Sequence, residues 1–141
     1  ALCDLAVAAS DARFATSGID VGLFCATPSV TLSRNVSRKA AFEMLVTGDF
    51  IDADTARERG LINRVAASDQ LDAELERLLA RILDKPRIAL ELGKALFYRQ
   101  LETGLDAALD DAGRTMARNM AHETALEGVQ AFLDKRPPAW R

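Results

Sequence analysis

The most regular pattern in this chain is the helical spacing of apolar residues in its second half. From residue 68 onward, apolar positions return every three or four residues, with charged residues between them. This spacing is typical of helices with one buried face. The pattern predicts four helices, over about 71–82, 86–104, 105–120 and 126–133. We expect their apolar stripes to form a core or to contact other subunits.

The beginning of the chain has the pattern of extended segments. Residues 2–9 form an apolar run interrupted only by Asp4, as in a strand that is buried on both faces. Shorter extended segments are predicted at 13–16 and 61–65, with a turn at 10–11. Three short strands are too few for a sheet of the usual size. The sequence therefore predicts either a fragment of a larger domain or strands supplied from elsewhere.

A glycine-containing loop, 17–23, connects the second extended segment to a helix. Gly18 and Gly22 tolerate backbone angles that other residues avoid, and they let a ligand approach the main chain. Thr27 and Pro28 are expected to start the helix, with Thr27 as its cap and Pro28 in its first turn. A loop that leads into a helix N-terminus can hold a polarised carbonyl group or an anion.

Capping residues predict the limits of two further helices. Ser37 is expected to cap a helix that ends at Gly48, because serine accepts hydrogen bonds from exposed amides and glycine adopts the left-handed conformation. By the same reasoning, Asp52 caps a short helix that Gly60 stops.

Composition excludes several classes of function. The 141 residues, 49% of them hydrophobic, suffice for one compact domain. The net charge of −3, with charges of both signs interleaved, argues against a nucleic-acid partner. No apolar run reaches the roughly 18 to 20 residues of a membrane span and no targeting segment is recognisable, so we expect a soluble protein with no membrane partner.

The cysteines and the histidine give no sign of a metal site. Cys3 and Cys25 lie in apolar surroundings without metal-ligand or redox spacing, which favours a reducing compartment such as the cytoplasm. Cys25 is in the right loop for a nucleophile, but the only histidine, His122, is far along the chain. We expect Cys25 to be a small buried side chain and His122 to be a surface or capping residue.

Three segments of this chain resemble a known family. They are CDLAVAASDARFATSGIDVGL at 3–23, EMLVTGDFIDADTARERGLINRV at 43–65 and EGVQAFLDKRPPAW at 127–140. The middle one is the most specific. In this order they resemble the second half of the crotonase superfamily, the enoyl-CoA hydratase/isomerase family, and within it the enoyl-CoA hydratase domain-containing subgroup.

The resemblance implies an α/β fold: the C-terminal part of a crotonase-like ββα spiral, followed by a helical trimerisation region. Residues 1–65 would be the remainder of the spiral core with the acyl-CoA pocket loop, and 66–141 the oligomerisation region. It also implies a homotrimer or hexamer, a role in fatty acid metabolism and a mitochondrial matrix location if the source is eukaryotic. Coenzyme A would be part of the substrate, with no separate cofactor.

The family chemistry is that of a lyase or isomerase. Two backbone N–H groups, expected before residue 1, stabilise an enolate oxygen on the thioester, and in hydratases two glutamates handle the added water. The second glutamate position is Gly18 here, which argues against hydration. Asp20 either substitutes for it or hydrogen-bonds its own backbone. A glutamate restored at Gly18 is expected to create hydration if the site is otherwise whole.

Three readings therefore stay open: an acyl-CoA enzyme of this family, a catalytically silent binding homologue, and a variant reaction such as isomerisation, decarboxylation or thioester hydrolysis. The resemblance implies that the acyl or thioester pocket is lined by Ser17, Gly18, Val21 and Ala26. It implies that Phe132 and Lys135 contact the adenine end of CoA. Their alternatives are a core contact for Phe132 and a solvated charge for Lys135.

Overall fold

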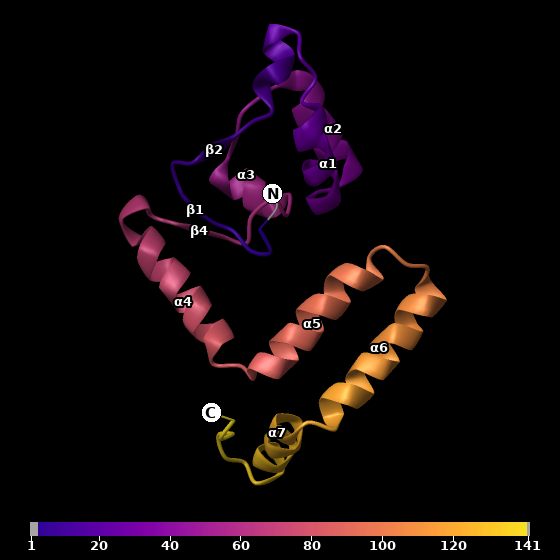
Figure 1. The fold of residues 1–141 in the computed structure, drawn as a ribbon. Helices are drawn as coiled ribbons and strands as arrows, with labels where there is room; N and C mark the ends of the chain where they lie inside the picture. Colours follow the sequence, from indigo (N-terminus) through magenta and orange to yellow (C-terminus); the bar gives the residue numbers. More distant parts are fainter. Residues whose placement is uncertain (1–2, 141) are drawn as a thin grey trace. The chain divides into compact units, whose positions relative to one another are not determined.

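The structure is a computed structural model that describes residues 3–140 (Figure 1). The chain divides into two compact units, Ala1–Leu78 and Leu79–Arg141. The functional division expected at residues 65 and 66 stays a prediction.

The first unit contains short strands and helices in alternation. Its elements, in chain order, are β1 (Val7–Ala9), β2 (Arg13–Phe14), the 3-10 helix η1 (Ser17–Val21), α1 (Ala26–Asn35), α2 (Arg38–Thr47), β3 (Ile51–Asp52), α3 (Ala53–Glu58), β4 (Arg64–Ala66), the 3-10 helix η2 (Ser68–Gln70) and α4 (Leu71–Leu83), which runs across the division.

The strands form two small ribbons. β1 pairs in parallel with β4, with Val7 opposite Arg64, and β2 pairs antiparallel with β3, with Arg13 opposite Asp52. A parallel pair needs a crossover connection, and the chain between β1 and β4 supplies it with the helices α1, α2 and α3. This is the strand-and-helix alternation that the sequence predicts.

The strands are shorter than predicted. The segment expected at 2–9 becomes a strand only from Val7, and Leu5 is 44% exposed; residue 2 lies outside the described residues. The segment expected at 61–65 begins three residues late, at Arg64, because the N–H of Leu61 donates to the carbonyl of Ala56 at 2.8 Å. That bond closes the end of α3 and keeps Leu61 out of the ladder.

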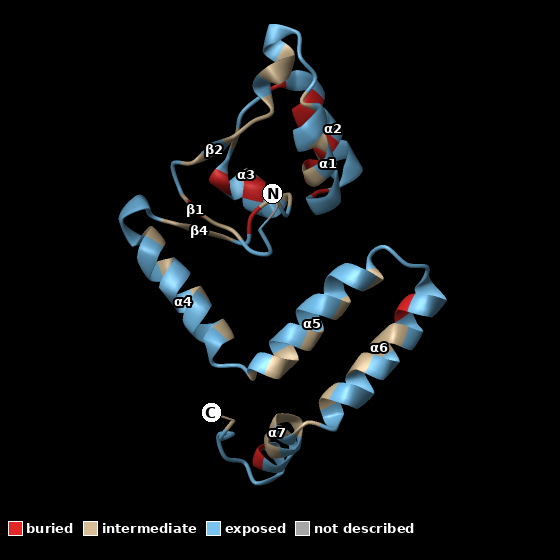
Figure 2. Cartoon of the chain, viewed as in Figure 1, coloured by how far each residue is buried: buried red, intermediate tan, exposed pale blue. Residues whose placement is uncertain are grey.

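Two apolar clusters hold the first unit together (Figure 2). One lies on α1 and α2 and contains Leu32, Val36, Ala41, Met44 and Leu45. The other joins β1 to α3 and contains Ala8, Ala53, Ala56 and Ile62. Both alanines of α3 have no exposed surface, so this helix packs closely against its neighbours.

Three of the predicted helix limits are confirmed by their hydrogen bonds. The Ser37 side chain accepts from the N–H of Ala40 at 3.3 Å at the start of α2, and Gly48 ends that helix with φ 72°. The Asp52 carboxylate accepts from the N–H of Thr55 at 2.8 Å at the start of α3, and this bond lowers the pKa of Asp52.

Two predicted limits are wrong. α1 begins at Ala26, with Cys25 rather than Thr27 as its N-cap residue. Pro28 is accommodated in the first turn, where its missing N–H would have no helical partner in any case. Gly104 does not end the preceding helix, which stops at Gln100; it is instead the N-cap of the next helix, with φ −68° and ψ 157°.

The second unit is helical, with α5 (Arg87–Gln100), α6 (Leu105–Met120) and α7 (Glu123–Leu133). α5 and α6 lie side by side (Figure 1) and are joined by an ion pair of 2.7 Å between Arg99 Nε and Asp111 Oδ2. This pair lowers the pKa of Asp111. Within the described residues, no helix has both the length and the apolar character needed to cross a membrane.

Over the described residues, the apolar stripes of these helices do not form the expected core within the second unit. Leu105 is 74% exposed and Phe132 is 82% exposed. Other exposed members of the stripes are Leu109, Met116, Met120, Leu126, Val129 and Leu133. Ala108 is the only buried residue among those described in α5 and α6. The other expected role of the stripes, contact with other subunits, stays a prediction.

Candidate functional site

The glycine-containing loop is a compact 3-10 turn rather than an open loop. The N–H of Gly22 donates to the carbonyl of Ile19 at 3.0 Å, and the N–H of Leu23 donates to the carbonyl of Gly18 at 2.9 Å. Gly22 ends the turn with φ 80°, a conformation that favours glycine. The backbone of η1 is therefore fixed by its own hydrogen bonds.

The turn is anchored to the C-terminal end of α2. The hydroxyl of Thr16 donates to the carbonyl of Met44 at 2.7 Å. Gly48 lies against the side chains of Ile19 and Asp20, so closely that a Cβ there would lie 2.9 Å from Ile19 Cγ2 and 2.9 Å from Asp20 Oδ1. The glycine thus ends α2 and also lets η1 pack on it.

Gly18 is enclosed by its own loop. A Cβ at this position would lie 2.7 Å from the carbonyl oxygen of Leu23 and 2.7 Å from the Sγ of Cys25. The sulfur can move but the carbonyl belongs to the backbone, so a side chain here requires the loop to shift. The loop in this conformation has no room for a glutamate, so the expectation that a glutamate restored at Gly18 creates hydration stays a prediction that also requires the loop to move.

Asp20, the nearest carboxylate, does not face Gly18. It is exposed, and its oxygens lie against Gly48 at the end of α2. Among the described residues its carboxylate accepts no hydrogen bond from its own backbone, which was the alternative role. Its position favours neither role that the sequence suggested.

The four residues expected to line the acyl pocket lie on this one segment. Ser17, Gly18 and Val21 belong to η1, and Ala26 is the first residue of α1. Val21 is 75% exposed, and Ser17 and Ala26 are also exposed. The segment therefore presents apolar side chains and backbone on its outer surface, next to a helix N-terminus.

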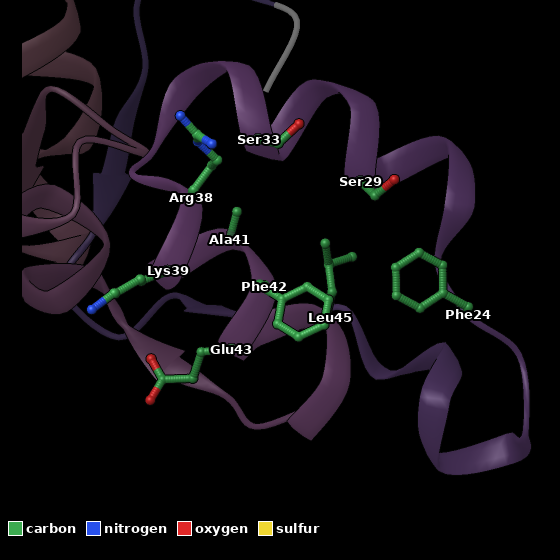
Figure 3. Close-up of a pocket in the computed structure, with 9 residues that line it drawn as sticks. All are labelled: Phe24, Ser29, Ser33, Arg38, Lys39, Ala41, Phe42, Glu43 and Leu45. Atoms are coloured by element: carbon green, nitrogen blue, oxygen red, sulfur yellow. The ribbon is translucent and has the colours of Figure 1, made fainter.

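The larger of two hollows in the first unit is lined by Phe24, within this segment, and by residues that follow the segment in the sequence, and it was not predicted. It measures about 600 Å³ between α1 and α2. Figure 3 shows Phe24, Phe42 and Leu45 gathered at one end of it, with Arg38 and Lys39 extending at the other. The signal for this hollow is Phe42, a large apolar residue that falls outside the buried stripe of α2, on its exposed side.

A smaller hollow of about 380 Å³ reaches the loop itself. It is lined by Thr16, immediately before η1, by Pro28 and Leu32 of α1, and by Phe14 and Met44. Neither of these two hollows is lined by Ser17, Gly18, Val21 or Ala26. Both hollows are therefore adjacent to the predicted pocket residues but do not include them.

Phe132 and Lys135 lie together at the end of α7, in the second unit. Phe132 is in the last turn and is 82% exposed, so it makes no core contact within its unit. Lys135 is exposed and adopts φ 53°, a conformation that is uncommon for a residue other than glycine. Its N–H donates to the carbonyl of Phe132 at 3.2 Å.

An ion pair next to this turn escaped the sequence reasoning. The guanidinium of Arg136 donates to both carboxylate oxygens of Glu127, at 2.7 and 3.0 Å. Together with a hydrogen bond from the N–H of Ala139, it lowers the pKa of Glu127 to about 2. The nine residues between Glu127 and Arg136 run past the end of α7 at Leu133, so helical periodicity does not predict this pair.

The remaining polar candidates have structural roles. His122 is the N-cap of α7 and accepts from the N–H of Thr124 at 3.3 Å, which confirms the capping role. Cys25 is half-buried, less than the buried side chain expected, and it packs against the α1 and α2 cluster. Cys3 is exposed, which corrects its expected apolar surroundings.

Comparison with known proteins gives the family. The enoyl-CoA hydratase/isomerase family model matches residues 1–141. The mitochondrial enoyl-CoA hydratase domain-containing protein 3 of Mus musculus is 46% identical over 140 residues, which cover 99% of this chain and 47% of the relative. The crotonyl-CoA hydratase of Syntrophomonas wolfei is 33% identical, over 95% of this chain and 52% of the relative.

Solved structures agree with this result. The crystal structure of an enoyl-CoA hydratase from Mycobacterium smegmatis is 64% identical, with a TM-score of 0.94 over 98% of this chain and 54% of that one. Human enoyl-CoA hydratase domain-containing protein 3 is 44% identical, with a TM-score of 0.91 over 98% of this chain and 55% of that one. The chain spans about half the length of the relatives it matches.

These matches confirm the fold class, the C-terminal part of a crotonase-like spiral followed by a helical region. They also confirm the subgroup that the loop and the middle motif suggested. The chain belongs to the enoyl-CoA hydratase/isomerase family of the crotonase superfamily, in the enoyl-CoA hydratase domain-containing subgroup.

Proposed function

We propose that the protein binds an acyl-CoA thioester without hydrating it. In this proposal, the segment from Ser17 to Ala26 contacts the acyl or thioester part, and Phe132 and Lys135 contact the adenine end of CoA. The observation that supports it most strongly is the enclosure of Gly18, where a Cβ would lie 2.7 Å from a backbone oxygen. Gly18, which is at the position of the second hydratase glutamate, therefore has no carboxylate and no space for one.

The chemistry of the loop supports binding. An acyl chain needs apolar surface, which the exposed Val21 and Ala26 offer. Backbone amides stabilise an enolate oxygen in this family, and they require no side chain at Gly18. Asp20 lies at Gly48 and is too far along the turn to replace the glutamate without a rearrangement, because a general acid must reach the reacting atom within hydrogen-bonding distance.

Two outcomes are compatible with such a site. An enolate-stabilising site with a different acid or base would carry out isomerisation, decarboxylation or thioester hydrolysis. If the site has no such acid or base, the protein binds acyl-CoA but is catalytically silent. The missing carboxylate at Gly18 favours this silent binding protein over a hydratase.

Assembly and location are part of the proposal. The exposed apolar stripes of α5, α6 and α7 support a homotrimer, or a hexamer formed from two trimers, because contiguous apolar surface of this kind marks protein contacts. A role in fatty acid metabolism follows from an acyl-CoA ligand. Relatives named as mitochondrial support the mitochondrial matrix if the source is eukaryotic, and the cytoplasm otherwise.

Thermal unfolding in the presence of crotonyl-CoA tests the binding proposal. A ligand at 100 times its dissociation constant stabilises the folded state by about 2.7 kcal/mol, so the melting temperature should rise with concentration and saturate. Val21→Glu places a charge on the proposed acyl surface and should abolish the shift. The matched control is Val30→Glu, at a valine of α1 that is 51% exposed. No shift for the wild type, or equal shifts for both variants, would contradict the proposal.

A further inference from the structure

The turn that carries Phe132 and Lys135 is held by a tail that folds back onto α7. The helix ends at Leu133 and the N–H of Arg136 donates to the carbonyl of Ala131 at 3.0 Å. Lys135 adopts φ 53° within this turn. A lysine holds such a conformation only when the surrounding structure fixes it.

The first fixing contact is the ion pair between Arg136 and Glu127. Its two parallel bonds, at 2.7 and 3.0 Å, orient the guanidinium against the side of α7, as bidentate arginine–carboxylate pairs do. The N–H of Ala139 donates to the same carboxylate at 2.8 Å. One glutamate therefore holds the chain on both sides of Pro137 and Pro138.

The second fixing contact is Trp140. Its Nε1–H donates to the carbonyl of Asp84 at 3.0 Å, and its ring lies on Gly128, where a Cβ would be 3.1 Å from Trp140 Cζ3. Because Gly128 has no side chain, the ring can pack directly against the backbone of α7. The tail is thus attached at Glu127, Gly128 and Asp84, all within the second unit.

We propose that Glu127, Arg136 and Trp140 are positioning residues, which hold Phe132 and Lys135 in the geometry that binds the nucleotide end of CoA. This inference rests on the proposed acyl-CoA function. Neither Glu127 nor Trp140 needs to touch the ligand. Their effect passes through the turn, because the strained backbone at Lys135 relaxes once the tail is released and the ammonium group then no longer stands at a fixed place.

The test compares two ligands: crotonyl-CoA, and crotonyl-pantetheine, which has the same thioester but lacks the nucleotide. Dissociation constants are measured by calorimetry for the wild type, Glu127→Ala and Gly128→Ala. A Cβ at Gly128 would lie 3.1 Å from Trp140 Cζ3, so the last variant shifts the ring by a few tenths of an ångström while it favours helix formation. It therefore separates positioning from folding. Glu91→Ala is the control, because it also removes a glutamate paired with an arginine, Arg87, at 2.6 Å on a helix of the same unit.

We expect the wild type to bind crotonyl-CoA more tightly than crotonyl-pantetheine. Glu127→Ala should lose about tenfold in affinity for crotonyl-CoA, the size of one charge-assisted contact. Gly128→Ala should lose less, and neither variant should lose affinity for crotonyl-pantetheine. Equal losses for both ligands, or wild-type affinities in both variants, would overturn the positioning role. A wild type that binds neither ligand would refute the acyl-CoA function itself, and one that binds both equally would refute only the nucleotide contact.

Discussion

Because Gly18 is enclosed, we predict that the single methyl group added by Gly18→Ala destabilises the protein. Ordinary van der Waals contact begins at 3.4 Å, and the Cβ of Gly18→Ala would lie at 2.7 Å from both Leu23 O and Cys25 Sγ. Such overpacking costs about 1–3 kcal/mol, so we expect the free energy of unfolding in urea to fall by that amount. In a double-mutant cycle, Gly18→Ala should cost about 0.5 kcal/mol or more less in a Cys25→Ala background than in the wild type, because Cys25→Ala relieves the sulfur contact but leaves the carbonyl contact.

A control with the opposite sign strengthens this test. Gly93 lies inside α5, and an added Cβ there would meet no described atom within 4 Å beyond its chain neighbours and the backbone of its own helix. Gly93→Ala should therefore stabilise the protein by about 0.5–1 kcal/mol through helix propensity. If Gly18→Ala were neutral or stabilising in the same assay, the loop could not have the conformation described, and the argument against a carboxylate at this position would fail.

Three further predictions concern the hydrogen bonds that fix the two units. Ser37→Ala removes the cap of α2 and should lower the free energy of unfolding by about 1 kcal/mol, whereas Ser37→Asp should retain it. Thr16→Val removes the 2.7 Å hydrogen bond to the carbonyl of Met44, which still accepts from the N–H of Gly48 at 3.2 Å, and should lower the free energy of unfolding by about 0.5–1.5 kcal/mol; an unchanged urea midpoint would contradict this role of the hydroxyl. The pKa of Glu127 is lowered from 4.5 to about 2 by Arg136. Because the folded value lies below the unfolded one, its contribution is complete above about pH 4.5 and is lost as the pH falls toward 2. Urea midpoints should then converge for the wild type and Glu127→Gln as the pH falls, and a constant difference would contradict the ion pair.

Local chemistry made part of the fold predictable. Ser37 and Asp52 cap their helices as expected, and Gly48 ends α2, because a cap depends on one side chain and the amides next to it. The same reasoning failed at Thr27 and Gly104, where two positions compete for the role. The carbonyl of Cys25 already accepts from the N–H of Ser29 at 2.9 Å, so α1 begins before Thr27 can cap it.

The candidate site was predictable in sequence position but not in space. The motif placed Gly18 where a glutamate stands in hydratases, yet the spacing carried no information that Leu23 O and Cys25 Sγ close over it. Periodicity likewise identified the stripe that includes Phe132, but a stripe has the same pattern whether its own chain or another subunit covers it. The pair between Glu127 and Arg136 depends on how the tail folds back, which no local pattern encodes.

Incubation of the protein with crotonyl-CoA in water enriched in oxygen-18 tests the central claim most directly. Hydration would add labelled water across the double bond, which mass spectrometry of the thioester detects with high sensitivity. With Gly18 unable to carry a proton, we predict that the protein binds crotonyl-CoA in the same sample and leaves no labelled 3-hydroxyacyl product above the rate without protein. Enzyme-dependent appearance of that product would contradict the account.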